Sequence, residues 1–186
     1  MKLNIPVNIP NVITVLRILV TPLFIILVQR DAYLAALLVF SFAGISDGLD
    51  GFLARYLNQR TRLGATLDPI ADKILLMSAY ILLALKGILP SWLTVIAISR
   101  DLLIIIGMAI LTFTRVKVEI NPSLISKFTT AAQLGAVFLT LLDPHPVQAF
   151  TFRSWVYWVT AVTTVVSGLH YVYIGLGILQ NALESE

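Results

Sequence analysis

The chain alternates long apolar stretches with short polar breaks, and this alternation constrains its fold more than any other feature. A membrane-spanning helix needs about 20 mainly apolar residues, and six stretches approach that length. They are Val12–Val28, Tyr33–Tyr56, Asp68–Lys86, Ser91–Thr114, Ser123–Leu142 and Ser154–Leu179. Because turn-forming and charged residues separate them, the sequence predicts an all-α integral membrane protein with six transmembrane helices.

The composition agrees with a single membrane-embedded domain over residues 1–186. Hydrophobic residues make up 58% of the chain and charged residues 12%, whereas soluble domains are typically about 25% charged. The net charge of +3 is therefore not taken as a sign of nucleic-acid binding, and no nucleic-acid partner is expected. The chain contains no cysteine, which excludes disulfides, thiolate metal ligands and cysteine nucleophiles.

The distribution of lysine and arginine predicts the orientation in the membrane. With six spans, both termini and the second and fourth loops share one side. That side carries Lys2, Arg55, Arg60, Arg62, Arg115 and Lys117 near helix ends, and the other carries Arg30, Lys86 and Arg153. Cytoplasmic loops are enriched in such residues, so we expect a multi-pass protein of the inner (plasma) membrane with both termini in the cytoplasm.

Four carboxylates border the second loop and are the strongest candidates for a functional site. Asp47 and Asp50 are three residues apart near the end of one predicted helix, and Asp68 and Asp72 are four apart at the start of the next. Each pair therefore shares a helix face. If the two helices fold back on each other, the pairs meet near the cytoplasmic interface. Asp68 alone could be a helix N-cap before Pro69, but caps do not explain four acids at these spacings.

Carboxylate oxygens are ligands for Mg²⁺ or Mn²⁺, and clustered acids need a positive charge between them. Two such ions about 3.5–4 Å apart can hold a diphosphate and stabilise an in-line displacement. Gly51 and Ala54 put little bulk near the acids, and Arg55 offers a bidentate donor to a phosphate oxygen. Gly64 permits a tight entry into the third helix.

These residues fit the pattern D-x2-D-G-x2-A-R-x8-G-x3-D-x3-D, from Asp47 to Asp72, at every specified position. The pattern resembles that of the CDP-alcohol phosphatidyltransferases, and the segments Ile9–Asn11, Ile98–Asp101 and Ile125–Lys127 look like that family too. The resemblance implies a six-helix membrane fold, usually homodimeric. It also implies transfer of a phosphatidyl group from CDP-diacylglycerol to an alcohol, with release of CMP.

By motif position, the resemblance assigns roles to the individual residues. Asp47, Asp50, Asp68 and Asp72 would be the metal ligands, with Asp72 also the general base. Residues Gly51, Ala54 and Arg55 would lie against the CDP moiety. The distribution of lysine and arginine places this active site at the cytoplasmic face.

Basic residues on the later helices favour an anionic acceptor alcohol. Arg100, Arg115 and Lys127 could converge on its head group. The alternatives are positive-inside topology for Arg115 and an ion pair for Arg100, for example with Asp101. We prefer glycerol 3-phosphate, as in bacterial phosphatidylglycerophosphate synthases, over phosphatidylglycerol, as in eukaryotic-type cardiolipin synthases.

The sequence leaves open the position of the Arg17 side chain and one alternative functional class. Arg17, one or two turns into the first helix, could snorkel to the interface or face the active-site cavity. The rival from another functional class is an ion-coupled transporter, because membrane carboxylates also serve cation relays. Transport would favour carboxylates at mid-membrane and an internal repeat, and the sequence shows neither.

Overall fold

The computed structural model describes residues 9–56, 62–113, 124–144 and 150–184, with side chains in 17–46, 73–107, 124–144, 152–178 and at 180. Within this part of the chain the structure is all-helical, as predicted, and has no strand. The elements are α1 (Ile9–Gln29), α2 (Tyr33–Tyr56), α3 (Arg62–Leu85), α4 (Ser91–Phe113), α5 (Leu124–Leu142) and α6 (Phe150–Glu184).

Most helix boundaries lie close to the predicted ones, but α3 and α6 are longer. The third helix begins at Arg62, not at Asp68. The predicted start at Asp68 is therefore wrong: Gly64 and Asp68 both lie within the helix, and Asp68 is not its N-cap. Hydropathy marks only the part of a helix suited to hydrocarbon, whereas the helix itself continues into the more polar residues 62–67.

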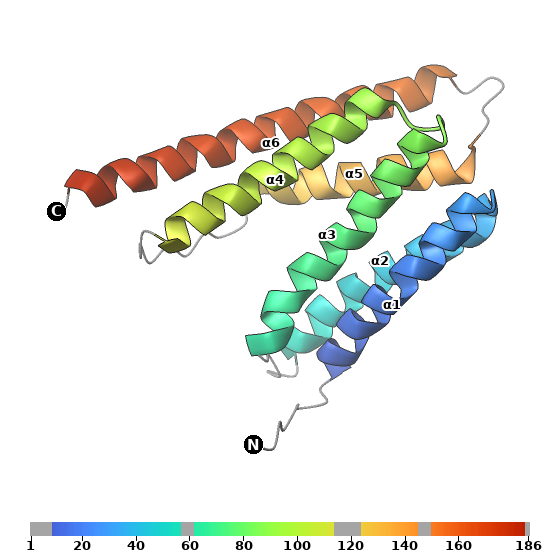
Figure 1. Cartoon of the computed structure of the whole chain (residues 1–186), viewed down its shortest axis with the longest axis horizontal. Helices are drawn as coiled ribbons and strands as arrows, with labels where there is room; N and C mark the ends of the chain where they lie inside the picture. The colour runs from blue at the N-terminus through green and yellow to red at the C-terminus, as the bar shows by residue number, and fades with distance from the viewer. Residues whose placement is uncertain (1–8, 57–61, 114–123, 145–149, 185–186) are drawn as a thin grey trace. The chain divides into compact units, whose positions relative to one another are not determined.

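The chain divides into two compact units, which we describe separately. The first contains Met1–Ile88 with Thr140–Pro144, and the second contains Leu89–Leu139 with His145–Glu186. The single domain over residues 1–186 stays a prediction. In the first unit, α1 packs against both α2 and α3 (Figure 1). Phe24 of α1 and Phe40 of α2 are both buried, with ring centroids 5.9 Å apart.

Helices α1 and α3 have the same type of C-terminal cap, and side-chain hydrogen bonds join the two C-terminal ends. Asp31 (φ 58°) and Gly87 (φ 72°) have left-handed backbone conformations just after the two helices. At each end, the N–H groups of this residue and of the next one donate to carbonyls of the last helical turn, which is the Schellman motif. Lys86 donates from Nζ to the Gln29 carbonyl (3.0 Å) and to Asp31 Oδ1 (2.7 Å). The Tyr33 hydroxyl donates to the same Asp31 oxygen at 2.6 Å.

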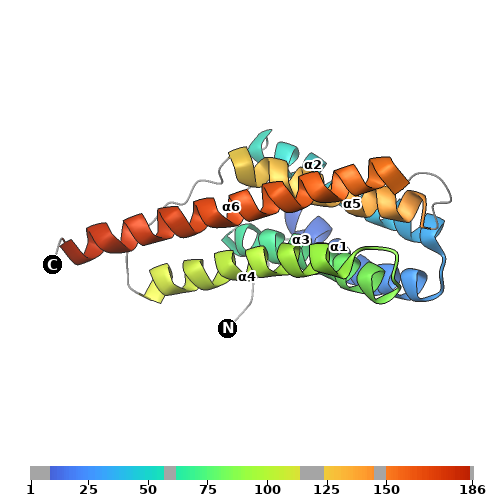
Figure 2. The ribbon, with the colours of Figure 1, turned by 90° about the horizontal axis from the view of Figure 1, so that it is seen from above.

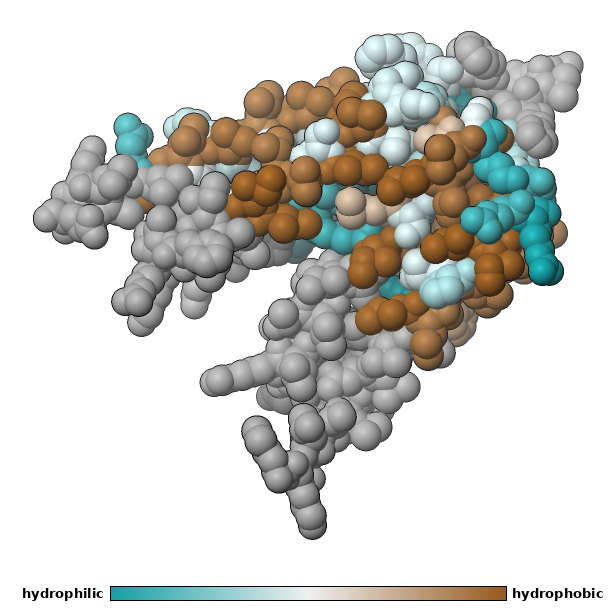
Figure 3. Space-filling model, viewed as in Figure 1, coloured by the Kyte–Doolittle hydropathy of each residue, from teal (hydrophilic) through white to brown (hydrophobic). Residues whose placement is uncertain are grey.

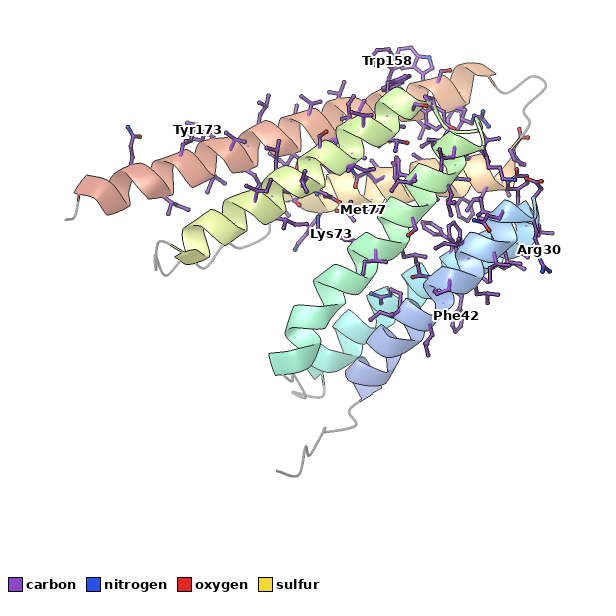
Figure 4. All side chains as sticks on the ribbon, in the orientation of Figure 1. Arg30, Phe42, Lys73, Met77, Trp158 and Tyr173 are labelled. Atoms are coloured by element: carbon purple, nitrogen blue, oxygen red, sulfur yellow. The ribbon has the colours of Figure 1, made fainter. Side chains whose placement is uncertain are left out.

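The second unit is built on α6. Helices α4 and α6 run side by side in Figures 1 and 2, and Trp92 near the start of α4 meets Trp158 near the start of α6 (ring centroids 5.1 Å apart). The two helices are therefore parallel. Figure 4 shows Trp158 near the start of α6 and Tyr173 near its other end.

Hydroxyl and amide side chains join α5 to α6. Thr129 Oγ1 donates to the Thr163 carbonyl (3.0 Å), and Thr160 Oγ1 donates to the Ala132 carbonyl (3.2 Å). Since residue numbers rise along α5 as they fall along α6, the helices are antiparallel. Small polar residues bonded across helices are typical of packing in membranes.

Many large hydrophobic side chains point outward, and brown hydrophobic areas are spread over the coloured part of the face in Figure 3. By length and composition, two helical segments among the described residues could cross a membrane, Leu124–Leu142 and Phe152–Ile178. Shorter apolar segments occupy Arg17–Gln29, Tyr33–Ser46 and Lys73–Leu85. Six membrane spans therefore remain a prediction.

Candidate active site

The two aspartate pairs lie on consecutive helices at matching distances from their connection. Asp50 is six residues and Asp47 nine residues before the end of α2. Asp68 is six residues and Asp72 ten residues after the start of α3. At 1.5 Å per residue, Asp50 and Asp68 each lie about 9 Å along the helix from the end next to the connection. Asp47 and Asp72 lie about 14–15 Å from the same ends.

Only residues 57–61 connect α2 to α3, and both helices pack against α1. Helices joined by so short a connection are usually antiparallel neighbours. Antiparallel helices would bring Asp50 level with Asp68, and Asp47 level with Asp72. The side chains of all four aspartates lie outside the described ones, so their contacts stay a prediction.

The other motif residues fall on the same helices. Gly51, Ala54 and Arg55 lie in the last two turns of α2, and Gly64 lies in the first turn of α3. Their side-chain surroundings are likewise outside the described part. Among the side chains that are described, no group of three or more histidine, cysteine, aspartate or glutamate residues could hold a metal ion.

Arg17 of α1 is buried, with 4% of its surface exposed. This burial argues against snorkelling, one of the two sequence interpretations. Residues 30–32 join α1 to α2, so α1 and α2 run antiparallel. Measured from this connection, Arg17 lies about 18 Å along α1 and Asp47 about 21 Å along α2. The buried Arg17 cation thus lies near the level of Asp47 along the two helices.

Arg100, predicted to contact the acceptor, is buried on α4 with 6% of its surface exposed. Its Nη1 donates to Asp101 Oδ1 at 2.8 Å, which is the ion pair left open by the sequence. Its Nη2 donates to Ser126 Oγ of α5 (2.7 Å) and Ser167 Oγ of α6 (2.9 Å). The guanidinium carbon also lies 5.8 Å from the centre of the Tyr171 ring.

The other two candidates for binding the acceptor are Lys127 and Arg115, and the structure describes only Lys127. Lys127 is exposed on α5, next to Ser126. Arg115 lies outside the described residues. The structure therefore brings Arg100 next to the residue preceding Lys127, but it gives no contact between the two cations.

Sequence reasoning missed the partners of Arg100 on the later helices. Ser126 lay in a segment noted only for its family resemblance, and Ser167 is a polar residue within a long apolar helix. The signal that could have found Ser167 is its small neighbour Gly168, which the structure places beside Arg100: a Cβ added at residue 168 would make an ordinary van der Waals contact with Arg100 Cγ at 3.5 Å. Small residues in apolar helices often mark close helix packing.

Comparison with known proteins gives a consistent result. The model of the family described as CDP-alcohol phosphatidyltransferase matches residues 7–166. The chain is similar to a protein of Pseudomonas fluorescens named CDP-diacylglycerol–glycerol-3-phosphate 3-phosphatidyltransferase, at 41% identity over 87% of this chain and 84% of that protein. A Bacillus subtilis (strain 168) protein of the same name is 34% identical over 88% of this chain and 93% of its own length.

A second group of similar proteins carries a different name. The Homo sapiens protein named cardiolipin synthase (CMP-forming) is 34% identical over 91% of this chain. The aligned region covers 62% of the human protein, so the present chain spans about 62% of that relative's length.

Proposed function

Because this chain belongs to the CDP-alcohol phosphatidyltransferase family, we propose that it transfers a phosphatidyl group from CDP-diacylglycerol to glycerol 3-phosphate. The products are phosphatidylglycerophosphate and CMP. The observation that carries the proposal is the similar spacing of the two aspartate pairs from the α2–α3 connection, six and nine residues on α2 and six and ten residues on α3. Matched levels on neighbouring helices are what a shared diphosphate and metal site requires.

The choice of glycerol 3-phosphate follows the names of the relatives that are similar over most of their length. The Pseudomonas and Bacillus proteins are matched over 84% and 93% of their chains. The second candidate is cardiolipin synthesis with phosphatidylglycerol as acceptor, favoured by the similarity to the human cardiolipin synthase. Both reactions use an anionic acceptor and release CMP.

The proposed metal ligands are Asp47, Asp50, Asp68 and Asp72. All four supply oxygen donors, the donor type that suits Mg²⁺ or Mn²⁺. When bound, two such cations would neutralise the diphosphate and the charge that develops on the departing CMP. Gly51, Ala54 and Arg55 would bind the CDP moiety alongside them.

The chain's own residues would supply the remaining chemistry. The acceptor hydroxyl oxygen attacks the phosphorus that carries the diacylglycerol, and Asp72 takes the hydroxyl proton. The bond from that phosphorus to the oxygen of CMP breaks, and CMP leaves with the electron pair. A carboxylate within hydrogen-bond reach of the hydroxyl is sufficient as a base, so no covalent enzyme intermediate is needed. Lys127 and Arg115 would bind the phosphate of the acceptor.

The membrane arrangement belongs to the same proposal. Six spanning helices with both termini in the cytoplasm would put the α2–α3 connection, and thus the acidic site, at the cytoplasmic face. Support comes from the two helical segments suited to spanning and from the distribution of basic residues. A homodimer is proposed from the family resemblance, and light scattering of the detergent-solubilised protein would measure it.

The decisive experiment measures CMP release by the purified protein from CDP-diacylglycerol. The acceptors are glycerol 3-phosphate, phosphatidylglycerol, inositol phosphate and serine, each with Mg²⁺, with Mn²⁺ and after chelation with EDTA. We expect metal-dependent release that is fastest with glycerol 3-phosphate. Release only with phosphatidylglycerol would select the second candidate. No release with any acceptor would refute the enzymatic assignment and favour the transporter.

A further inference from the structure

The Arg100 guanidinium is enclosed by protein groups from three helices. Asp101 of α4, Ser126 of α5 and Ser167 of α6 accept its hydrogen bonds at 2.7–2.9 Å. The Tyr171 ring of α6 lies beside it at 5.8 Å, a distance suited to a cation–π interaction. These contacts link all three helices of the second unit through one side chain.

This enclosure leaves Arg100 poorly placed to bind a substrate. Both donors of Nη2 are taken by serine hydroxyls, and the charge is balanced by the adjacent carboxylate. Among the described residues, the buried Nε has no hydrogen-bond partner. A phosphate from solution would reach the guanidinium only if helices moved apart, and it would then also face the Asp101 carboxylate.

The hydrogen bond from Arg100 to Ser126 connects the network to the start of α5. Ser126 is the third residue of α5, within the turn that has no intrahelical partners for its N–H groups and frays most readily. Its hydroxyl is tied to Arg100 and therefore to α4 and α6. The next residue is the exposed Lys127.

We infer that Arg100 is a positioning residue that fixes the first turn of α5, and thereby Lys127, for binding the anionic acceptor. Arg100 does not itself contact the acceptor. A planar guanidinium suits this role because its donors reach several partners at fixed angles. The inference rests on the proposed function only for the role of Lys127, because the network itself is a feature of the structure.

The first arm of the test needs no enzymatic activity. The chain has no cysteine, so a nitroxide can be attached at a single site in a Lys127→Cys variant of the full-length protein. Ser167→Ala removes one Arg100 partner from a different helix, and Thr163→Ala is the matched control because the Thr163 hydroxyl donates within its own helix. We expect a larger mobile fraction in the electron paramagnetic resonance spectrum of the Ser167→Ala protein only.

Arg100→Lys serves as a second variant in the same label experiment, since an ammonium group cannot keep the same three bonds in one plane. An unchanged spectrum in both Ser167→Ala and Arg100→Lys overturns the inference. So does equal mobility in Ser167→Ala and Thr163→Ala. Size-exclusion profiles identify any variant that fails to fold, and the other variant then decides.

The second arm measures the KM for glycerol 3-phosphate in a double-mutant cycle of Ser167→Ala and Lys127→Ala. Residues of one hydrogen-bonded network show coupling equivalent to roughly twofold to hundredfold changes. We expect Ser167→Ala to raise this KM about fivefold when Lys127 is present, and to leave it unchanged in the Lys127→Ala background. The KM for CDP-diacylglycerol should stay constant throughout.

The alternatives predict different results in this cycle. If Arg100 bound the acceptor directly, Ser167→Ala would leave the KM for glycerol 3-phosphate unchanged, or its fold-effect on this KM would multiply with that of Lys127→Ala. A merely structural role would lower the melting temperature without a selective change in the KM for the acceptor. Each of these results overturns the inference. If the wild-type protein releases no CMP at all, the proposed function fails, while the label experiment still decides the positioning role.

Discussion

Replacing Asp101 by asparagine tests how much the buried ion pair of α4 matters to stability. The Arg100–Asp101 pair is separated by 2.8 Å, and each side chain is only 6% exposed. Asp101→Asn preserves the size of the side chain but removes its charge, which takes from the buried Arg100 cation the one counter-charge that the described side chains give it. The chain also contains a matched control, the exposed Lys86–Asp31 pair at 2.7 Å, with exposures of 31% and 61%.

Asp101→Asn should lower the free energy of unfolding several-fold more than Asp31→Asn, although the two ion-pair distances are nearly equal. Breaking a buried pair by removing one charge costs about 3–5 kcal/mol, whereas an exposed pair contributes about 0.2–1 kcal/mol. For a chain of this size, each kcal/mol shifts the melting temperature by roughly 2–4 °C. We therefore expect a fall of about 6–20 °C for Asp101→Asn and no more than about 4 °C for Asp31→Asn. Asparagine also tolerates the positive φ of residue 31.

The measurement is thermal unfolding in detergent, followed by the fluorescence of Trp92, Trp155 and Trp158. A double variant, Arg100→Met with Asp101→Leu, removes both charges and should recover part of the lost stability, because apolar residues can replace a buried pair at little cost. Equal shifts for Asp101→Asn and Asp31→Asn would refute the reasoning. So would a double variant less stable than Asp101→Asn alone.

The remaining predictions concern the acidic site, the acceptor and one helix end. Asp50→Asn and Asp68→Asn should each abolish CMP release while the melting temperature stays within a few degrees of wild type; activity retained in either would argue against the metal ligands. Asp72→Asn should reduce kcat by at least about a hundredfold with a smaller effect on CDP-diacylglycerol binding, and equal losses would contradict its role as base. Lys127→Ala should raise the KM for glycerol 3-phosphate, and an unchanged value would remove Lys127 from the acceptor site. Gly87→Ala should lower stability by about 1–2 kcal/mol because residue 87 has φ 72°; calorimetric or fluorescence melting that shows no loss would contradict this.

The helices could be predicted from the sequence because hydropathy and turn residues act over short distances along the chain. The bounds of α2 agree with the prediction, and those of α4 and α5 differ by one residue at one end. The start of α3 was missed because the helix continues past the apolar stretch, through Arg62 and Gly64. Hydropathy records which residues suit hydrocarbon, and it does not record where backbone hydrogen bonding stops.

The acidic residues could be found from spacing alone, because intervals of three and four residues fix a shared helix face. The structure adds the positions of the two pairs relative to the end of α2 and the start of α3, and the level match between the pairs stays a prediction. The burial of Arg17 could not be predicted in this way. Spacing along one helix does not say which side of that helix its neighbours cover, and α1 packs against two of them.

The contacts of Arg100 also could not be predicted from residue spacing along its own helix. Residues at adjacent positions do not face each other on a helix, so residue spacing alone does not favour Asp101 over other acids as the partner of Arg100. The pair forms because the arginine side chain is long enough to bring Nη1 to the neighbouring carboxylate while Nη2 reaches Ser126 and Ser167. Those two serines are 41 residues apart in the sequence and come together only because α5 and α6 pack antiparallel. A cation in an apolar helix is thus ambiguous until its tertiary partners are known. Its charge predicts an anion nearby, and only the packing of the other helices decides whether that anion is a substrate or a side chain of the same chain.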